Sequence, residues 1–266
     1  MIGIDFGSTY TDVAYYSKGT VRFASFESGS FSLDALEKLA VGDGKVAVTG
    51  AVAVVEKRNP GILQLGRRLR LVKIGEIDAI ARGARHLTGK GRMLVANVGT
   101  GTPFVYVDGS TARHVAGTGI GGGTLSGLAR LLVNTRVENM EELARRGTPR
   151  LDLTVGEAVG GGVGIVGGDA TASNFGKAAS AKRVHNEDVA LSTINLVAEA
   201  VGTMALLAAK GCGCEKDIVF TGRAVARNKL MQEKIGEVMR LFGGKAVFPE
   251  NAEYCTAMGA LLSLGK

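Results

Sequence analysis

The sequence predicts an α/β protein built from two lobes with a ligand cleft between them. Segments patterned like strands alternate with segments patterned like helices along all 266 residues. Two similar hairpins rich in glycine and threonine, at 5–9 and 97–102, each follow a short apolar strand. Glycine fills 40 positions, about twice its usual share, and clusters where a backbone must turn tightly or approach a ligand.

The first lobe is expected to span residues 1–95. It opens as a β-meander, because a short apolar strand ends in an Asp-x-Gly turn and two alternating segments follow it. Apolar spacing then predicts two helices separated by a strand. The predicted elements are strands at 1–9, 11–16 and 20–26, a helix at 33–39, a strand at 45–49 and a helix at 76–87.

The second lobe is expected to span residues 96–266, with an approximate boundary, and to contain more helix. Two strands repeat the opening hairpin, and Asn186 can cap the longest helix. The predicted elements are strands at 93–97 and 104–107, helices at 124–133, 137–146 and 187–210, a strand at 218–221, and helices at 228–241 and 256–264. Whether the last helix packs back on the first lobe is left open.

The charge balance favours an anionic ligand of low molecular mass. Lys and Arg exceed Asp and Glu by 32 to 25, which gives a net charge of +7 and a pI near 9.4. Tryptophan is absent and aromatic residues make up only 5%, so little material is available for stacking nucleic-acid bases. A nucleotide or another small phosphate compound is therefore favoured over nucleic acid.

Cysteine usage and hydropathy predict a soluble, cytoplasmic protein with no membrane partner. Three cysteines are too few for a disulfide framework, and their spacing suggests no zinc site. Asp5 interrupts the apolar start, so the N-terminus does not have the pattern of a signal peptide. The most apolar stretch, 196–209, contains Glu199 and predicts a buried helix.

The first hairpin combines groups that can bind the phosphates of a nucleotide. Asp5 at the strand end can hold the hydration shell of Mg²⁺, and Gly7 permits a tight turn. The hydroxyls of Ser8 and Thr9 can donate to phosphate oxygens, and Thr100 has the matching place in the second hairpin. An ordinary hairpin is the alternative, but a second hairpin of the same kind makes it less probable.

A glycine run before an apolar helix predicts an anion site at the helix start. Gly121, Gly122, Gly123 and Thr124 form this run. Exposed amides and the positive end of the helix dipole would both attract phosphate. No lysine follows, so the run is not a Walker A loop, and a flexible linker is the alternative. Another glycine-rich stretch, 160–168, predicts either a mobile loop beside the substrate or a plain surface loop.

Glu76 and Asp78 lie where residues 71–74 give way to a helix. A carboxylate there is stabilised by the helix dipole. It could also act as the general base toward a substrate hydroxyl, as phosphoryl transfer to an alcohol requires. Position alone favours the capping role.

The order of the motifs resembles the type II pantothenate kinases, over nearly the whole chain. The matching segments are 3–9 (GIDFGST), 76–79 (EIDA), 96–102 (ANVGTGT), 115–124 (VAGTGIGGGT), 168–176 (GDATASNFG) and 257–261 (AMGAL). The resemblance implies the two-lobed, actin-like ATPase fold, related to ribonuclease H, with ATP bound between the lobes. It also implies phosphorylation of pantothenate to 4′-phosphopantothenate by a homodimer that uses Mg²⁺ with ATP, and coenzyme A or its acyl esters as a candidate regulator.

The resemblance also assigns roles to individual residues. Glu76 would take the proton from the pantothenate hydroxyl. The residues that would surround Mg-ATP are Asp5, Gly7, Ser8, Thr9, Thr100, Gly121, Gly122, Gly123 and Thr124, with Gly222 beside the adenosine. The residue before Val115 would bind the substrate.

Two positions depart from the family pattern. His114 stands where the family has an arginine, with Arg113 one residue earlier, so Arg113 could substitute or the substrate could be held differently. Asp12 stands where the family usually has a lysine, so a cation near the transferred phosphate is replaced by an anion.

These departures keep three other functions open. One is a kinase of the same fold that acts on another small alcohol, and the second is a catalytically weak regulator that binds a nucleotide or acyl-CoA. The third is the ATPase activator of a 2-hydroxyacyl-CoA dehydratase, which would need a cysteine-held iron–sulfur cluster. The isolated pair Cys212 and Cys214 argues against that activator.

Overall fold

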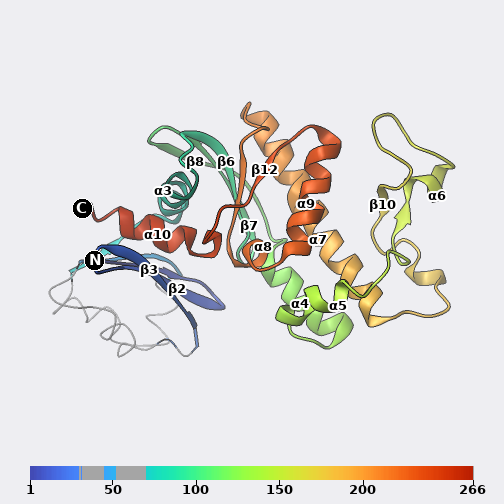
Figure 1. Cartoon of the computed structure of the whole chain (residues 1–266), viewed down its shortest axis with the longest axis horizontal. Helices are drawn as coiled ribbons and strands as arrows, with labels where there is room; N and C mark the ends of the chain where they lie inside the picture. The colour runs from blue at the N-terminus through green and yellow to red at the C-terminus, as the bar shows by residue number, and fades with distance from the viewer. Residues whose placement is uncertain (30, 32–44, 52–69, 266) are drawn as a thin grey trace.

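The computed structural model describes residues 1–29, 31, 45–51 and 70–265. The helix predicted at 33–39 lies outside the described residues. The described part forms two five-stranded sheets, with two helices between them and further helices on the outer side of the second sheet (Figure 1).

The first sheet has the strand order β3-β2-β1-β4-β5. Its strands are β1 (Ile2–Phe6), β2 (Tyr10–Ser17), β3 (Thr20–Glu27), β4 (Lys45–Gly50) and β5 (Arg70–Lys73). The first three strands form an antiparallel meander, and β4 and β5 continue the sheet in parallel with β1. Ile2, Ile4 and Phe6 alternate onto one face, where they form an apolar cluster with Val46 and Val48.

The second sheet, ordered β12-β11-β6-β7-β8, repeats this topology. Its strands are β6 (Arg92–Asn97), β7 (Thr102–Asp108), β8 (Thr111–Thr118), β11 (Ile218–Thr221) and β12 (Ala246–Val247). Again the first three are antiparallel, and the two that follow are parallel to the first. The repeated unit predicted from the two hairpins is therefore confirmed at the level of strand order.

Helices cover the outer face of the second sheet. They are α4 (Gly122–Val133), the 3-10 turn η2 (Val137–Asn139), α5 (Met140–Ala144), α7 (Asn186–Gly211), α8 (Arg223–Ala226) and α9 (Lys229–Phe242). The helix predicted at 137–146 is observed as the 3-10 turn η2 followed by the shorter helix α5. Gly147, beyond its end, lies against α7, where a Cβ would be 2.3 Å from the Glu187 carbonyl oxygen. α7 is long and apolar enough to pass a composition test for a membrane span, but 67% of that stretch is buried within the protein, as in a core helix.

Two helices lie between the sheets and cross each other (Figure 1). α3 (Glu76–Thr88) packs its apolar face on the second sheet, whereas α10 (Cys255–Leu262), from the far end of the chain, packs on β1, β2 and β4. Their crossing depends on glycine: a Cβ on Gly83 would lie 1.9 Å from the Cys255 carbonyl oxygen, and one on Gly259 would lie 1.7 Å from the Ala79 carbonyl oxygen. Gly3 likewise lets β1 lie close to α10, because a Cβ on Gly3 would be 2.2 Å from the Leu261 nitrogen.

The thiol of Cys255 is fully buried at this crossing and predicts a loss of stability in alkaline solution. Its Sγ donates to the Ile80 carbonyl oxygen at 3.6 Å, and burial raises its pKa to about 12 from 9.0. Because the folded-state pKa is the higher one, the stabilisation is complete below pH 9 and is lost as the pH rises from 9 toward 12. We expect Cys255 to cost about 1 kcal/mol of unfolding free energy between pH 9 and pH 10, measured by denaturant titration.

The control for this prediction is Cys255→Ala, which removes the buried thiol. It should flatten the alkaline decline, although Cys214, with its pKa raised to about 11, keeps part of it. Cys212→Ala, which removes a thiol that is only partly buried, is the matched substitution away from the helix crossing. A Cys255→Ala protein with an undiminished decline would contradict the assignment.

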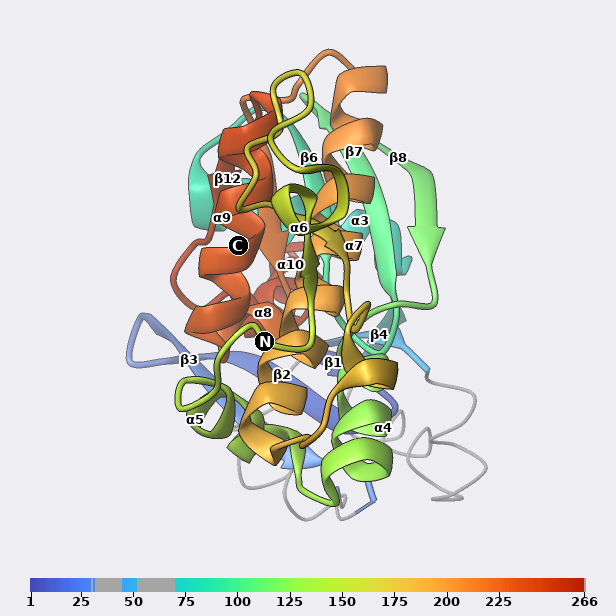
Figure 2. The same cartoon turned by 90° about the vertical axis from the view of Figure 1, so that its right-hand side faces the viewer.

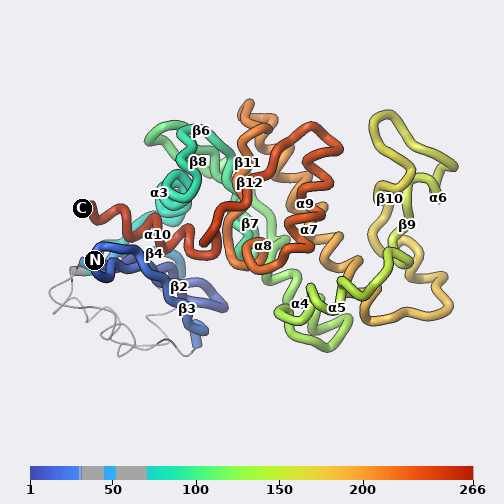
Figure 3. Tube along the Cα trace, in the orientation of Figure 1, coloured from blue at the N-terminus to red at the C-terminus, as the bar shows by residue number. Residues whose placement is uncertain are grey.

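Residues 151–185 form an arm that projects from the protein beyond α4 and α5 (Figures 1 and 3). The arm contains β9 (Leu153–Thr154), α6 (Val155–Val159), β10 (Thr171–Ser173) and the 3-10 turn η3 (Ala178–Ser180). Figure 2 views it from its outer end, with α7 behind it. The glycine-rich stretch 160–168 belongs to this arm, far from the two hairpins of the same chain, which fits the predicted surface loop rather than a loop beside the substrate.

Candidate active site

The tips of the two predicted phosphate hairpins meet. The Oγ of Ser8, between β1 and β2, lies 2.5 Å from the Oγ1 of Thr100, between β6 and β7. Because these strands belong to different sheets, this contact brings together the turns that the sequence marked as similar. Both hydroxyls are exposed.

Four backbone amides at these tips remain available to a ligand. Within the described residues, no acceptor is found for the N–H groups of Ser8, Thr9, Thr100 and Gly101. The neighbouring groups are used to shape the turns: Gly7 N–H donates to the Tyr10 carbonyl oxygen at 3.0 Å. Free amides on two facing turns form a concave donor surface suited to phosphate oxygens.

The glycine run at the start of α4 has a different role from the predicted one. The Gly122 and Gly123 amides donate to the carbonyl oxygens of Gly99 and Thr100, at 2.7 and 2.9 Å. The Gly121 amide donates to the Thr124 hydroxyl at 3.2 Å, and that hydroxyl donates to the Gly119 carbonyl oxygen. These groups are therefore not free for an anion; the prediction of exposed amides at Gly121, Gly122 and Gly123 is wrong.

The glycines of this run instead hold the second hairpin in place. A Cβ on Gly121 or Gly122 would lie 2.9 Å from carbonyl atoms of the hairpin, which is too close for any side chain. Only glycine allows the helix start to lie directly against the turn. The run thus supports the amides at Thr100 and Gly101 rather than adding its own.

Asp5 lies at the end of β1, on the face of the sheet that α10 covers. It is paired across strands with Asp12, and the Thr256 side chain at the start of α10 hydrogen bonds to it. Burial, followed by the charges of Glu76 and Asp12, raises the pKa of Asp5 to about 7 from 3.8. A divalent cation would relieve this accumulation of negative charge, so the carboxylate fits a role beside Mg²⁺.

Glu76 is the first residue of α3 and is exposed. Its charge acts on Asp5, so the two carboxylates lie in one neighbourhood although 70 residues separate them. Gly75 before it makes no side-chain cap, and Asp78 is the second exposed acid of the same turn. Either carboxylate can interact favourably with the positive end of the helix dipole, but it is the charge of Glu76 that acts on Asp5.

An ion pair that the sequence did not reveal joins the two halves of this site. Arg223 follows Gly222 and reaches from α8 to Asp12 on β2 and to Ser25 on β3, both through Nη2. Its guanidinium also lies over the ring of Tyr10, 4.1 Å from the ring centre. Nothing in the spacing of residues 12 and 223 could have indicated this contact.

The two predicted substrate residues point in opposite directions. On β8, Arg113 pairs with Tyr106 and lies over its ring at 5.8 Å. His114 pairs with Val105, whose side chain packs against α3. Because successive side chains of a strand alternate between faces, only His114 shares the face on which α3 lies. One substrate group cannot contact both residues.

Two of the three cysteines lie in the protein interior. Cys214 is buried, its pKa is raised by burial to about 11, and Cys255 is buried at the helix crossing. Across the part of the chain that the structure describes, no group of three or more His, Cys, Asp and Glu side chains could hold a metal by itself.

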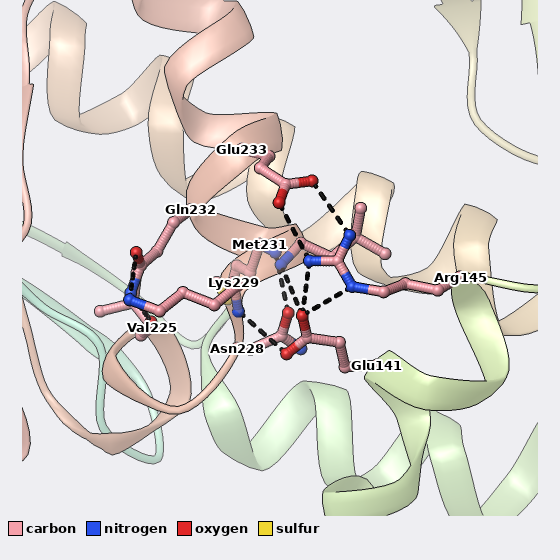
Figure 4. A network of polar contacts seen from close by, with 9 residues as sticks. Glu141, Arg145, Val225, Asn228, Lys229, Met231, Gln232 and Glu233 are labelled. Atoms are coloured by element: carbon pink, nitrogen blue, oxygen red, sulfur yellow. Dashed lines mark hydrogen bonds and ion pairs between the residues drawn. The ribbon is translucent and has the colours of Figure 1, made fainter.

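A pocket along α9 and a polar network at the start of α9 are separate from these groups. The pocket, of about 440 Å³, is lined by residues of α9, by 244–246 and by Phe248, and contains none of the predicted site residues. Figure 4 shows Glu141 accepting from the Lys229 amide at 2.9 Å, while Arg145 bridges Glu141 and Glu233. This network caps α9 and joins it to α5, so it stabilises the lobe.

Comparison with known proteins identifies both the fold and the family. One solved structure that resembles this chain is component A of the (R)-2-hydroxyglutaryl-CoA dehydratase of Acidaminococcus fermentans. The TM-score is 0.64 and the sequence identity is 16%, and the match covers 98% of this chain and 96% of that one. The ROK hexokinase of Thermus thermophilus matches with a TM-score of 0.58 and 13% sequence identity, over 98% of this chain and 97% of that one. The predicted actin-like ATPase fold is thereby confirmed.

Sequence relatives give the family. Residues 92–263 match the family model described as Fumble. The type II pantothenate kinase of Bacillus cereus is 31% identical over 98% of this chain and 96% of its own length. The enzyme of the same name from Staphylococcus epidermidis is 33% identical over 70% of this chain and 73% of its own length. The chain belongs to the type II pantothenate kinase family.

Proposed function

We propose that this protein transfers the γ-phosphoryl group of ATP to the hydroxyl of pantothenate, forming 4′-phosphopantothenate, the first step toward coenzyme A. The observation that carries this proposal is the meeting of two hairpins with four free amides beside Asp5 and Glu76. Family membership supplies the acceptor, since the relatives are named pantothenate kinases.

The residues of the site divide the chemistry among them. The free amides of Ser8, Thr9, Thr100 and Gly101 hold phosphate oxygens, and Glu76 takes the proton as the hydroxyl oxygen attacks the γ-phosphorus. The bond from that phosphorus to the bridging oxygen breaks, and ADP leaves with the electron pair. Mg²⁺ bound with ATP would neutralise charge on the phosphate oxygens, and Asp5 is the carboxylate that would hold it.

The acceptor is tested by following ADP formation in a coupled assay. The protein is given Mg-ATP with pantothenate, with pantetheine, or with a panel of small alcohols. Turnover that depends on pantothenate supports the proposal. Turnover only with another alcohol would move the chain to a different substrate, a result that the histidine at position 114 makes worth checking.

His114 is proposed as the residue that contacts the acceptor, because it shares a face of the second sheet with α3 and its terminal Glu76. We expect His114→Ala to raise KM for pantothenate about tenfold, the value of one lost polar contact. Arg113→Ala should change KM less than twofold, because that side chain lies on the other face. The reverse order of effects, measured in initial rates, would contradict this assignment.

A homodimer is proposed on the strength of exposed apolar side chains. The arm and the neighbouring helices expose large apolar residues, namely Leu131, Leu132, Val159, Val163, Ile165, Val184 and Leu207. We propose that a second copy of the chain covers part of these exposed side chains, which would remove apolar surface from water. Light scattering on the purified protein tests it. A cytoplasmic location, where ATP is supplied, and regulation by coenzyme A or its acyl esters complete the proposal.

A further inference from the structure

The contact between Arg223 and Asp12 places a cation beside the strands that carry the first hairpin. Gly222, directly before it, lies against the second hairpin, where a Cβ would come within 2.5 Å of the Val98 carbonyl oxygen. Asp12 lies directly across from Asp5 on the neighbouring strand. Arg223 therefore starts beside one hairpin and ends beside the carboxylate at the base of the other.

Much of the donor capacity of Arg223 is unused. Both Asp12 and Ser25 accept from Nη2. The Nε atom is buried and has no partner within the described part of the chain. A guanidinium has five N–H donors in a rigid fork, a geometry that matches phosphate oxygens. An anion that reaches this fork would give the buried donor an acceptor.

The pair is held more firmly than a surface ion pair. The Asp12 side chain is 11% exposed and that of Arg223 is 23% exposed. The Tyr10 ring covers one face of the guanidinium, and the Tyr10 hydroxyl donates to a carboxylate oxygen of Glu138 at 3.1 Å. Asp12 and Tyr10 thus fix the direction of the arginine from the first sheet, while its backbone belongs to the second lobe.

We infer that Arg223 is a phosphate-binding residue of this chain, aligned by Asp12 and directed at the β- and γ-phosphates of a nucleoside triphosphate. The inference rests on the proposed function for the position of the phosphates. The three carboxylates Asp5, Asp12 and Glu76 would otherwise repel a polyphosphate from the gap between the hairpins. Arg223 offsets that repulsion, and Asp12 serves to position it.

Calorimetric binding of AMP, ADP and a non-hydrolysable ATP analogue, in the presence of Mg²⁺, tests the inference without any acceptor. We expect Arg223→Ala to lower the affinity for the ATP analogue by about tenfold or more and to leave the affinity for AMP within about twofold of the native value. Arg227→Ala is the matched control, since Arg227 lies on the same short segment and pairs with Glu253 at 3.1 Å. It should leave all three affinities unchanged.

A transferred charge provides the second arm of the test. In Asp12→Lys/Arg223→Ala the cation comes from β2 instead of α8, and the affinity for the ATP analogue should return to within about threefold of the native value. A merely structural role for the pair would give no such recovery. Where Arg223→Ala fails to fold in a thermal scan, Arg223→Gln takes its place, because the amide can still donate to Asp12.

Two results would overturn the inference. One is an equal loss of affinity for AMP and for the ATP analogue, which would make the pair a link between the lobes. The other is unchanged binding of the analogue by Arg223→Ala. Neither depends on pantothenate, so a failed acceptor assay with normal ATP binding leaves this test intact. A native chain that binds no ATP analogue at all would defeat both this inference and the proposed function.

Discussion

Glu76→Gln is expected to lower kcat with pantothenate by ~10²- to 10⁴-fold while leaving the affinity for ATP nearly unchanged. The amide keeps the size of the side chain and its place at the start of α3 but cannot accept the proton of the attacking hydroxyl. Because Glu76 is exposed and makes no cap, the substitution should not unfold the helix. Steady-state rates at saturating ATP measure the effect.

Asp78→Asn is the matched control, since Asp78 is the other exposed acid in the first turn of α3. If both carboxylates act only by interacting with the positive end of the helix dipole, the two variants should lose similar, small amounts of stability and little activity. A Glu76→Gln enzyme within about threefold of the native rate would show that another group takes the proton.

Gly259→Ala is expected to destabilise the protein by roughly 3 kcal/mol or more and to reduce activity as well. The added methyl group would lie 1.7 Å from the Ala79 carbonyl oxygen, so α3 and α10 would have to separate. Both helices carry site residues at their starts, Glu76 on α3 and Thr256 on α10. A shift of either helix would therefore change the neighbourhood of Asp5. Denaturant unfolding and kcat are the measurements.

A second glycine-to-alanine change separates this close contact from a general effect of helical glycine. Gly127 lies within α4, is exposed, and has no neighbouring atom within 4 Å of where its Cβ would be. Gly127→Ala should stabilise the protein by about 0.5 to 1 kcal/mol, because alanine loses less backbone entropy in a helix. Equal destabilisation by both changes would contradict the importance of the crossing.

The fold could be predicted from local patterns because its repeated unit is local. Each hairpin joins strands that are adjacent in sequence, so alternation and turn residues were sufficient to indicate it. The packing of α3 on the second sheet and of α10 on the first sheet could not be predicted from local patterns. It depends on the contacts of Gly83 and Gly259, glycines within helical segments whose partners lie about 175 residues away.

Site residues could be predicted where residues that can bind phosphate also lie in a turn that the sequence marks. Ser8, Thr9 and Thr100 sit in turns whose composition marks them, and the structure brings the Ser8 and Thr100 tips together. The glycine run 121–123 was predicted to offer free amides, but the Gly122 and Gly123 amides are bonded to the second hairpin, which only three-dimensional packing reveals. Arg223 had no local signal, because its partner on β2 belongs to the other sheet.

The central claim is that this site moves a phosphoryl group from ATP to the hydroxyl of pantothenate. The most direct measurement uses ATP labelled at the γ-phosphate, Mg²⁺ and pantothenate, with products separated and identified by mass spectrometry. We expect label on pantothenate, one phosphoryl group for each ADP formed, and almost none with Glu76→Gln. Label recovered only as inorganic phosphate, or no pantothenate-dependent ADP at high protein concentration, would contradict it.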